Sequence, residues 1–356
     1  MKFKLSNRII SKKTLPYIIA EVGVNHECSL SKAKKLIFEA KKGGADSVKF
    51  QTYKANLLAS KNSPAYWDTK KEKSKSQYEL FKKYDSFTIK DYKVLFKYCK
   101  KLKIDFSSTP FDLNSVDELS PFLKFFKISS SDITNFPLLK KIATKKKPVL
   151  LSTGASNLDE IKEAVEFLKK RGCKKIVIMH CILSYPTKNY DANLSMITDL
   201  KEKFPDHIIG YSDHTLPDNQ MSKIVTSYIL GARVIEKHFT LNKKEKGNDH
   251  YHSMDKNDLI LLIKNLNQTK KILGIDEKKV ILAEKNSRKF ARRSIVAKKD
   301  LYKDHVLKPQ DIICKRPGTG ISPKFISKIL NKKILKNLKE DQIITWKHIG
   351  RFKILP

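Results

Sequence analysis

The sequence predicts an α/β protein in which a (β/α)8 barrel is followed by a small, mostly-β domain. Short apolar runs alternate with amphipathic stretches from residue 17 to about residue 275, as parallel strands and their crossover helices do. Eight candidate strands fit into this stretch, which has the length of a (β/α)8 barrel, about 250 residues. After Leu273-Gly274 the alternation stops, which predicts the second domain. A doubly wound open sheet is the alternative architecture for the first domain.

Each candidate strand is an apolar run of four to six residues. The eight runs are Tyr17–Val22, Ser47–Phe50, Asp105–Ser108, Phe125–Ile128, Val149–Ser152, Ile176–His180, Ile208–Tyr211 and Arg233–His238. The amphipathic stretches between them include Ser31–Lys42, Ile89–Lys101, Leu158–Lys170 and Met221–Leu230. Asn157 precedes the third of these and is followed by two acidic residues, Asp159 and Glu160, so we predict that it caps a helix.

Polar residues follow most of the predicted strands. They are Glu21, Lys49, Gln51, Thr109, Lys127, Ser152, Thr153, His180, Ser212, Asp213, His214, Glu236 and His238. The C-terminal ends of all strands in a (β/α)8 barrel face one active site, so we expect these sequence-distant side chains to converge. Any one of them alone could be an ordinary capping or core residue. Their repetition at equivalent strand ends favours a shared site.

The C-terminal part of the chain has a different pattern. Residues 276–290 form a charged linker after a first domain at residues 1–275. Residues 291–356 contain short apolar segments, with turn signals at Pro309 and Pro317-Gly318 and little room for long helices. We therefore predict a small β domain of about 65 residues there.

The composition is that of a globular protein. The chain has 356 residues, 40% of them hydrophobic, and a mean hydropathy of −0.44. No window approaches the roughly 18 apolar residues of a membrane span, and the N-terminus lacks an apolar signal core. The five cysteines are scattered and form no CxxC pair, which fits free thiols in a reducing compartment. We expect a cytoplasmic protein with no membrane partner.

The formal net charge of +36 is extreme and admits a nucleic-acid-binding function. However, only eight of the 73 basic residues are arginine, and the lysines are spread along the chain without interleaved aromatic residues. This distribution favours a compositional bias over a nucleic-acid surface, so we expect no nucleic-acid partner. A smaller share of the charge could attract an anionic substrate.

Two histidines close predicted strands, His214 and His238. Neutral imidazoles from two barrel strands suit a divalent transition metal. Two ligands leave positions open for water and substrate, as Lewis-acid catalysis requires. Asp213 and Glu236 beside them could orient the rings or bind the metal directly. Core histidines satisfied by hydrogen bonds are the alternative.

Two lysines, Lys49 and Lys127, lie inside apolar strand runs. A lysine in a barrel mouth is costly unless an anion meets it. Together with nearby hydroxyl groups they would hold a phosphate or carboxylate; these hydroxyls belong to Thr109, Ser130, Ser152 and Ser212. A Schiff-base role for either lysine is the rival chemistry.

Longer motifs run in order along nearly the whole chain. The first is IIAEVGVNHECSLSKAKKLIFEAKKGGADSVKFQTY, followed by SSTPFD, FFKISSSDITNFPLL, PVLLSTGAS, MHCILSYPT, NLSMI, IIGYSDHT, VIEKHFT and KRPGTGISP. Together they strongly resemble the N-acetylneuraminate (sialic acid) synthase family, and residues 291–356 resemble its SAF, or antifreeze-like, domain. The resemblance implies a barrel plus this domain, and a domain-swapped homodimer in which the tail of one chain caps the barrel of the other.

The resemblance also implies a reaction. Phosphoenolpyruvate condenses with an open-chain N-acetylated amino sugar, N-acetylmannosamine or similar, to give a nine-carbon 2-keto sugar acid and phosphate. A divalent metal, Mn²⁺ or Mg²⁺, is implied as cofactor, with His214 and His238 as its ligands, and it would polarise the sugar aldehyde. Glu21 is implied as the catalytic carboxylate, a group suited to proton transfer.

The other site residues that the resemblance implies are substrate contacts. Those of the phosphoenolpyruvate pocket are Lys49, Thr109, Lys127, Ser130, Ser152 and Ser212. The sugar contacts are Gln51, Tyr185 and Asp249, and Glu236 is placed with the substrates. Arg316, in KRPGTG, is implied as a residue donated across the dimer, whose guanidinium would bind polar groups of the sugar.

Three departures from the family pattern stand out. Leu183 occupies a position where the family often has a small polar residue, and Asp132 stands where it usually has glutamate. The segment KGNDHYHSMD also carries His250 and His252 beside Asp249. We expect these histidines to be either further substrate contacts or surface loop residues. Because this segment differs from that of the simplest sialic acid synthases, we also expect a different sugar substrate.

Three alternatives to a sialic acid synthase remain open. The chain could be a legionaminic or pseudaminic acid synthase, which would use a diacetamido-trideoxyhexose. It could be a Lys-rich nucleic-acid-binding protein, for which binding would depend steeply on salt. It could also be a non-catalytic barrel whose tail binds carbohydrate, although the intact Glu21, Lys49, His214 and His238 argue against this.

Overall fold

The protein, as a computed structural model, is described over residues 2–67, 69, 72–247 and 249–350 and divides into two compact units, residues 1–274 and 275–356. The first unit contains an eight-stranded parallel sheet. Its strands are β3 (Tyr17–Gly23), β4 (Ser47–Thr52), β5 (Asp105–Pro110), β6 (Phe126–Ile128), β7 (Val149–Ser152), β8 (Ile176–Cys181), β9 (Ile208–Asp213) and β10 (Val234–His238). All eight coincide with predicted strands.

The sheet has the strand order of a barrel. Hydrogen-bonded neighbours run β5-β4-β3-β10-β9-β8-β7-β6, and the two end strands, β5 and β6, contact each other. Chain order is therefore preserved around the ring, without the reversal that defines a doubly wound sheet. The predicted barrel architecture is confirmed.

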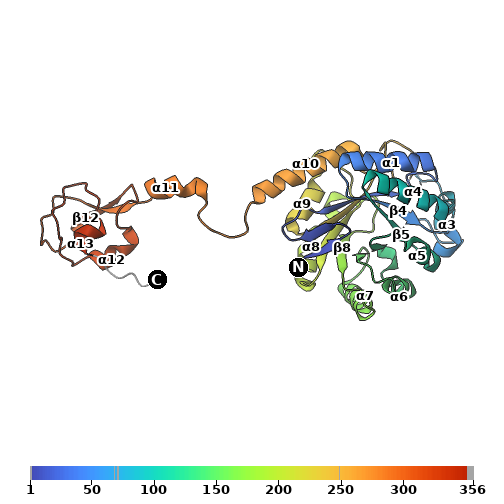
Figure 1. Cartoon of the computed structure of the whole chain (residues 1–356), viewed down its shortest axis with the longest axis horizontal. Coiled ribbons are helices and arrows are strands. Elements are labelled where there is room, and N and C mark those ends of the chain that lie inside the picture. The colour runs from blue at the N-terminus through green and yellow to red at the C-terminus, as the bar shows by residue number, and fades with distance from the viewer. Residues whose placement is uncertain (1, 68, 70–71, 248, 351–356) are drawn as a thin grey trace. The chain divides into compact units, whose positions relative to one another are not determined.

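Helices surround the strands (Figure 1). The longer ones are α1 (Leu30–Gly43), α4 (Ile89–Leu102), α5 (Leu113–Leu119), α6 (Phe136–Ala143), α7 (Leu158–Lys170), α8 (Met196–Lys203), α9 (Ser222–Leu230) and α10 (Lys256–Leu273), while α2 (Ala55–Leu58) and α3 (Gln77–Lys83) lie between β4 and α4. The side chain of Asn157 accepts from the first-turn amides of α7, as predicted. None of the described helices has the length and apolarity of a membrane-spanning segment.

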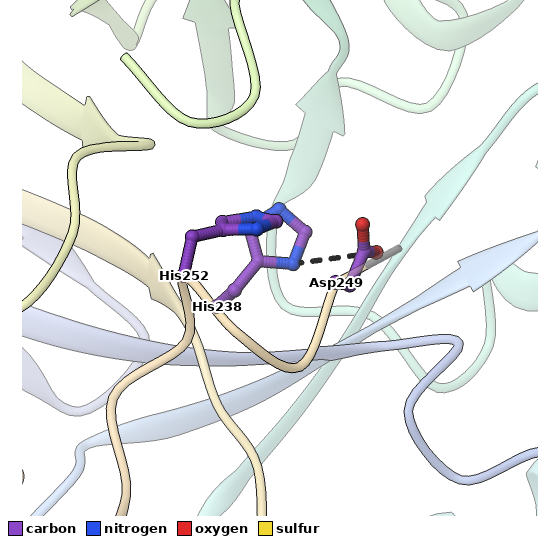
Figure 2. Close-up of side chains that lie close together, drawn as sticks. All are labelled: His238, Asp249 and His252. Atoms are coloured by element: carbon purple, nitrogen blue, oxygen red, sulfur yellow. Dashed lines mark ion pairs between the residues drawn. The ribbon is translucent and has the colours of Figure 1, made fainter. Parts of the chain in front are cut away.

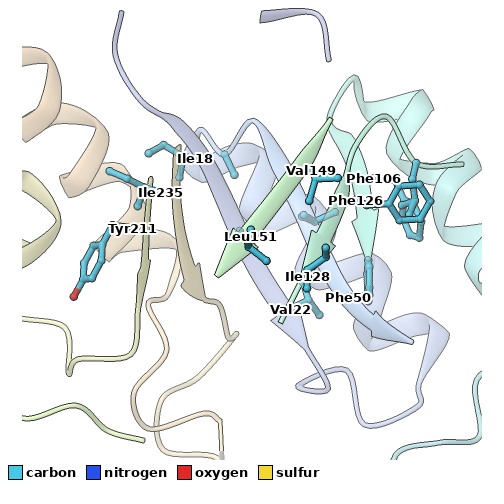
Figure 3. Close-up of a cluster of buried hydrophobic side chains, with 14 of the residues drawn as sticks. Ile18, Val22, Phe50, Phe106, Phe126, Ile128, Val149, Leu151, Tyr211 and Ile235 are labelled. Carbon is cyan, nitrogen blue, oxygen red and sulfur yellow. The ribbon is translucent and has the colours of Figure 1, made fainter. Parts of the chain in front are cut away.

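Strand side chains alternate between two environments because successive residues point to opposite faces of a strand. One set faces the helices and forms the larger hydrophobic core; Figure 3 shows members of it. Those labelled are Ile18, Val22, Phe50, Phe106, Phe126, Ile128, Val149, Leu151, Tyr211 and Ile235. The other set points into the barrel.

A hairpin packs against apolar residues at the N-terminal ends of the barrel strands. It consists of β1 (Lys2–Leu5) and β2 (Arg8–Ser11), and the sequence analysis did not predict it. Leu5 and Ile10 from the hairpin form one buried cluster with Tyr17, Ile19, Phe125, Leu150, Val177, Met179, Ile208 and Val234. Two residues further along several of these strands the side chains are polar. The barrel interior is therefore apolar near the N-terminal ends of the strands and polar near their C-terminal ends.

The second unit is small and mostly β, as predicted. Strands β11 (Ser294–Ala297) and β12 (Ile312–Lys315) pair antiparallel, and isolated bridges join Val296 to Ile343 and Leu301 to Leu338. The predicted linker region contains the short helix α11 (Lys285–Phe290), and two one-turn helices follow later, α12 (Ile326–Ile329) and α13 (Trp346–Ile349).

Asp311 is a buried hydrogen-bond acceptor in this unit, with a side chain 1% exposed. Its carboxylate accepts from His305 Nε2 and from the Lys308 amide, each at 2.8 Å, and lies 2.9 Å from Lys299 Nζ. Burial alone would raise the pKa of Asp311, but these donors lower it to about 2. The ionised carboxylate therefore stabilises the folded unit.

We expect Asp311→Asn to lower the free energy of unfolding of this unit by about 1–3 kcal/mol at pH 7, because the donors lose their charged acceptor. The contribution of the carboxylate is present above its unfolded pKa of about 3.9 and is lost as pH falls towards its folded pKa of about 2. Urea titrations of the full chain at several pH values measure the free energy of unfolding. The difference in this free energy between Asp311→Asn and wild type should become smaller below about pH 4. A difference that is independent of pH would contradict this assignment.

Candidate active site

A cavity of about 340 Å³ lies at the C-terminal ends of the barrel strands. Every predicted site residue except Arg316 lines it: Glu21, Lys49, Gln51, Thr109, Lys127, Ser130, Ser152, Tyr185, Ser212, His214, Glu236, His238 and Asp249. Arg316 lies in the second unit, exposed, directly after β12. Its donation across a dimer stays a prediction.

Strand alternation decides which polar residues enter the cavity. Ser212 and His214 line it, whereas Asp213 between them accepts from Lys237 Nζ at 2.7 Å outside it. His180 is likewise turned away, with its Nε2 2.9 Å from the carbonyl oxygen of Ala192. The expectation that all polar residues at the strand ends converge was therefore wrong for Thr153, His180 and Asp213, because neighbouring strand residues point to opposite faces.

Glu21, at the end of β3, lies at the centre of a charged network. Its Oε1 accepts from Lys49 Nζ at 2.5 Å and from Gln51 Nε2 at 3.0 Å. Lys49 also donates to Thr109 Oγ1 at 3.1 Å. Burial alone would raise the pKa of Glu21, but the charges of Lys49 and Lys127 lower it to about 2. Glu21 is therefore ionised at neutral pH and able to accept a proton.

Glu236, from β10, forms the second half of the network. Its Oε1 accepts from Lys127 Nζ at 3.1 Å and from Ser212 Oγ at 3.2 Å, and lies 3.8 Å from Lys49 Nζ. Glu236 Oε2 and Ser152 Oγ are buried without a hydrogen-bond partner among the described residues. Buried polar atoms are rarely left unsatisfied, so these two mark places where a polar ligand would bind.

The two predicted metal ligands lie side by side. The rings of His214 and His238 are 5.6 Å apart between centroids, and Tyr185 packs 4.2 Å from His214. Nδ1 of His214 donates to the carbonyl oxygen of Ile182 at 2.8 Å, which leaves Nε2 for a ligand. Burial, together with the charge of His214, lowers the pKa of His238 well below its usual value, so His238 is neutral, as a metal ligand must be.

His214 has a different protonation behaviour. Burial alone would lower its pKa, but the Cys181 thiol, 3.8 Å from Nδ1, and the Ile182 carbonyl raise it to about 9. Binding of a cation at His214 would therefore release a proton. Cys181 also lines the cavity, and sequence reasoning missed it although it directly ends β8.

The flanking carboxylates do not hold the imidazoles as expected. Asp213 pairs with Lys237, and Glu236 pairs with the cavity lysines. Asp249 instead lies beside His238, with its Oδ2 3.5 Å from His238 Nδ1. Glu21 Oε2 lies 3.6 Å from the other nitrogen, Nε2.

Two histidines of the segment after β10, His250 and His252, are buried, so of the two alternatives given for them, surface loop residues was the wrong one. His250 lines the cavity, and its Nδ1 lies 2.8 Å from Thr240 Oγ1. It also lies near Glu27 and Glu245, two carboxylates that already form ion pairs with Lys32.

Among the residues that the structure describes, two groups of three or more side chains could hold a metal ion. One is formed by His238, Asp249 and His252, whose ligand atoms lie within 4.8 Å of one another. The other is the set of Glu27, Glu245 and His250. Because Lys32 already neutralises the second set, the first is the better cation site.

The sequence analysis also missed an apolar wall of the cavity. Its residues come from the segment between β4 and α4: Tyr53, Leu58, Tyr66, Trp67, Leu80, Phe81 and Tyr84. The signal was present as a density of aromatic residues in a long connection, which is where barrel enzymes carry their specificity.

The two single-residue departures both lie in the cavity wall. Leu183 and Asp132 line it, and Asp132 accepts from Asn135 Nδ2 at 3.0 Å. Ser130 Oγ accepts from the Gly154 amide at 2.9 Å, which leaves its hydrogen available to a ligand. The two departures therefore leave the hydroxyl donor of Ser130 in place in the cavity.

The chain matches the NeuB family over residues 36–278 and the SAF domain over residues 292–350. It is 43% identical to the N,N'-diacetyllegionaminic acid synthase of Campylobacter jejuni, over 94% of this chain and 99% of the relative. Its identity to the N,N'-diacetyllegionaminic acid synthase of Legionella pneumophila is 38%, over 94% of each chain. A solved structure of N-acetylneuraminic acid (sialic acid) synthetase from Leptospira borgpetersenii superposes with a TM-score of 0.72 at 32% identity, covering 81% of this chain and 95% of that one.

These matches confirm the family that the motifs indicated, and with it the expectation of a condensing synthase. The cavity, the barrel that builds it and the small β unit agree with the same assignment. The chain belongs to the NeuB family and carries a SAF domain at residues 292–350.

Proposed function

We propose that the protein condenses phosphoenolpyruvate with an open-chain 2,4-diacetamido-trideoxyhexose, giving a nine-carbon 2-keto sugar acid and inorganic phosphate. The observation that carries this proposal is the pair of buried lysines, Lys49 and Lys127, in the mouth of the barrel. Beside them lie Ser152 Oγ and Glu236 Oε2, two buried polar atoms without a partner among the described residues.

Phosphoenolpyruvate carries a carboxylate and a phosphate, so its binding needs buried cations and hydroxyl donors. Lys49 and Lys127 supply the cations, and Thr109, Ser130, Ser152 and Ser212 supply hydroxyls. A charge-assisted hydrogen bond in a buried site is roughly twice as strong as a neutral one. The polar half of the barrel interior therefore has the chemistry to hold this substrate.

The reaction joins C3 of phosphoenolpyruvate to the aldehyde carbon of the sugar. A water molecule adds to C2, the bond from C2 to the phosphate oxygen breaks, and the keto group forms. Glu21, ionised and 2.5 Å from Lys49, begins the cycle as a proton acceptor. Lys49 and Lys127 stabilise the charge that develops on the departing phosphate.

A divalent cation, Mn²⁺ or Mg²⁺, when bound by His214 and His238, would polarise the sugar aldehyde. The residues fit such an ion: His238 is neutral, and its Nδ1 is buried without a hydrogen-bond partner among the described residues. The homodimer and the role of Arg316 in it rest on the family resemblance.

N-acetylmannosamine is the second candidate sugar. The apolar wall formed by Leu58, Tyr66 and Phe81 and their neighbours favours the diacetamido-trideoxyhexose, because that sugar presents more methyl groups and fewer hydroxyls. The relatives at 43% and 38% identity, both N,N'-diacetyllegionaminic acid synthases, support the same choice.

The test is phosphate release from phosphoenolpyruvate by the purified full chain, with each sugar in parallel and with and without Mn²⁺. We expect Mn²⁺-dependent release with the diacetamido-trideoxyhexose that exceeds release with N-acetylmannosamine. A clear preference for N-acetylmannosamine would instead identify sialic acid as the product. Absence of release with both sugars and Mn²⁺ would overturn the proposal.

A further inference from the structure

We propose that His252 is a direct ligand of the cation that His214 and His238 would bind, and that it acts there together with Asp249. The inference deepens the proposed function and rests on it for the role of the ion. It adds to the two histidines at the strand ends a third imidazole from the segment that follows β10.

His252 is completely buried, and neither of its ring nitrogens has a hydrogen-bond partner among the described residues. An unsatisfied buried polar atom costs about 1–3 kcal/mol. By contrast, His180 bonds the Ala192 carbonyl and His250 bonds Thr240 Oγ1, so each has a partner on one ring nitrogen. The two unsatisfied ring nitrogens of His252 therefore indicate a binding partner other than the surrounding side chains.

The neighbours of His252 are themselves metal-binding groups. Its ring lies 4.9 Å from the ring of His238 between centroids, and His238 Nδ1 lies 3.5 Å from Asp249 Oδ2 (Figure 2). One ligand atom from each of the three residues lies within 4.8 Å of the others. Ligands on opposite sides of one ion are about 4.2 Å apart at a bond length of about 2.1 Å, so small side-chain movements bring the three atoms onto one ion.

The donor chemistry favours a cation over other ligands. His238 Nδ1, like His252, has no hydrogen-bond partner in the described part of the chain, so two imidazoles offer lone pairs beside a carboxylate. Two imidazoles and one carboxylate are a donor set that divalent transition metals accept. A bridging water molecule is the rival occupant, since it too could satisfy polar atoms in a buried pocket.

The backbone holds the segment of His252 against β10. The Met254 amide donates to the His238 carbonyl at 2.8 Å, and Ser253 Oγ donates to the Asp249 carbonyl. Asn25 Nδ2 donates to Ser253 Oγ at 3.2 Å. The two residues after His252 are thus tied to its proposed co-ligands, Ser253 to Asp249 and Met254 to His238, which places the three side chains together before any ion binds.

A spectroscopic test asks whether position 252 touches the ion. His252→Cys is loaded with Co²⁺ in the absence of phosphoenolpyruvate and sugar, so that the result does not depend on turnover. A thiolate bound to Co²⁺ gives a charge-transfer absorption in the near ultraviolet, and the measured quantity is the absorption in excess of wild type, because Cys181 already lines the cavity. His207→Cys is the matched control, since His207 immediately precedes β9 and its Nδ1 is 3.2 Å from the Ile176 carbonyl.

We expect the absorption in His252→Cys and not in His207→Cys. A folded His252→Cys protein that binds Co²⁺ without this absorption would overturn the proposal. Titration calorimetry of His252→Asn with Mn²⁺ provides the second measurement, for which we expect affinity about 10–100-fold below wild type. An unchanged Mn²⁺ affinity, as a bridging water would predict, would also overturn it. Intact metal binding with no phosphate release would instead count against the proposed function.

Discussion

Lys49→Met is expected to lower kcat/KM for phosphoenolpyruvate by about 10²–10³-fold, the usual effect of removing one charged donor from a buried active site. Lys49 is 2% exposed and is the group that Glu21 Oε1 and Thr109 Oγ1 share. Without it, Glu21 and Glu236 face each other across the pocket with only Lys127 between them. The pKa of Glu21 should then rise, because Lys49 is the largest of the charges that lower it.

The matched control is Lys42→Met, which removes an exposed lysine near the end of α1 and should leave kinetics unchanged. Steady-state phosphate release measures both variants, and circular dichroism verifies that each is folded. If folded Lys49→Met kept activity within a few-fold of wild type, the phosphoenolpyruvate pocket would have been placed wrongly.

Lys237→Met is expected to have the largest effect on stability, about 3–5 kcal/mol, because it leaves a buried charge without its partner. Lys237 and Asp213 are 1% and 2% exposed and lie 2.7 Å apart. Lys237 also donates to the Thr215 carbonyl at 2.6 Å, so it joins the ends of β9 and β10 that carry His214 and His238. Urea unfolding of the full chain measures the loss.

Two further variants test the cause of this loss. Lys237→Met combined with Asp213→Asn should recover part of the stability, because no uncompensated charge remains. Lys162→Met removes a surface partner of Asp159, with side chains 49% and 92% exposed, and should cost less than about 1 kcal/mol. A loss in Lys237→Met no greater than that of Lys162→Met would show that the pair does not hold the strand ends together.

The barrel strands could be predicted because their runs are apolar and their connections are amphipathic. The direction of individual side chains could have been predicted too, by applying the two-residue period strictly. Ser212 and His214 enter the cavity and Asp213 does not; Glu236 and His238 enter it and Lys237 does not. The sequence analysis expected every polar residue at a strand end to enter the site, and so did not separate the residues that point inward from those that point outward.

Other features depend on contacts that no local pattern encodes. The β1–β2 hairpin has four-residue strands with charged residues, and only its packing of Leu5 and Ile10 into the barrel reveals its role. His252 lies in an irregular segment, where sequence spacing fixes neither burial nor direction. Its proximity to His238 comes from backbone hydrogen bonds between that segment and β10.

The central claim is that this barrel forms a carbon–carbon bond between phosphoenolpyruvate and an amino sugar. The most direct measurement is mass spectrometry of the products from phosphoenolpyruvate labelled with ¹³C at all of its carbons, with the diacetamido-trideoxyhexose and Mn²⁺. We predict one sugar acid that carries the whole labelled three-carbon unit for each phosphate released. Labelled pyruvate with unchanged sugar, or phosphoenolpyruvate left intact, would contradict the account.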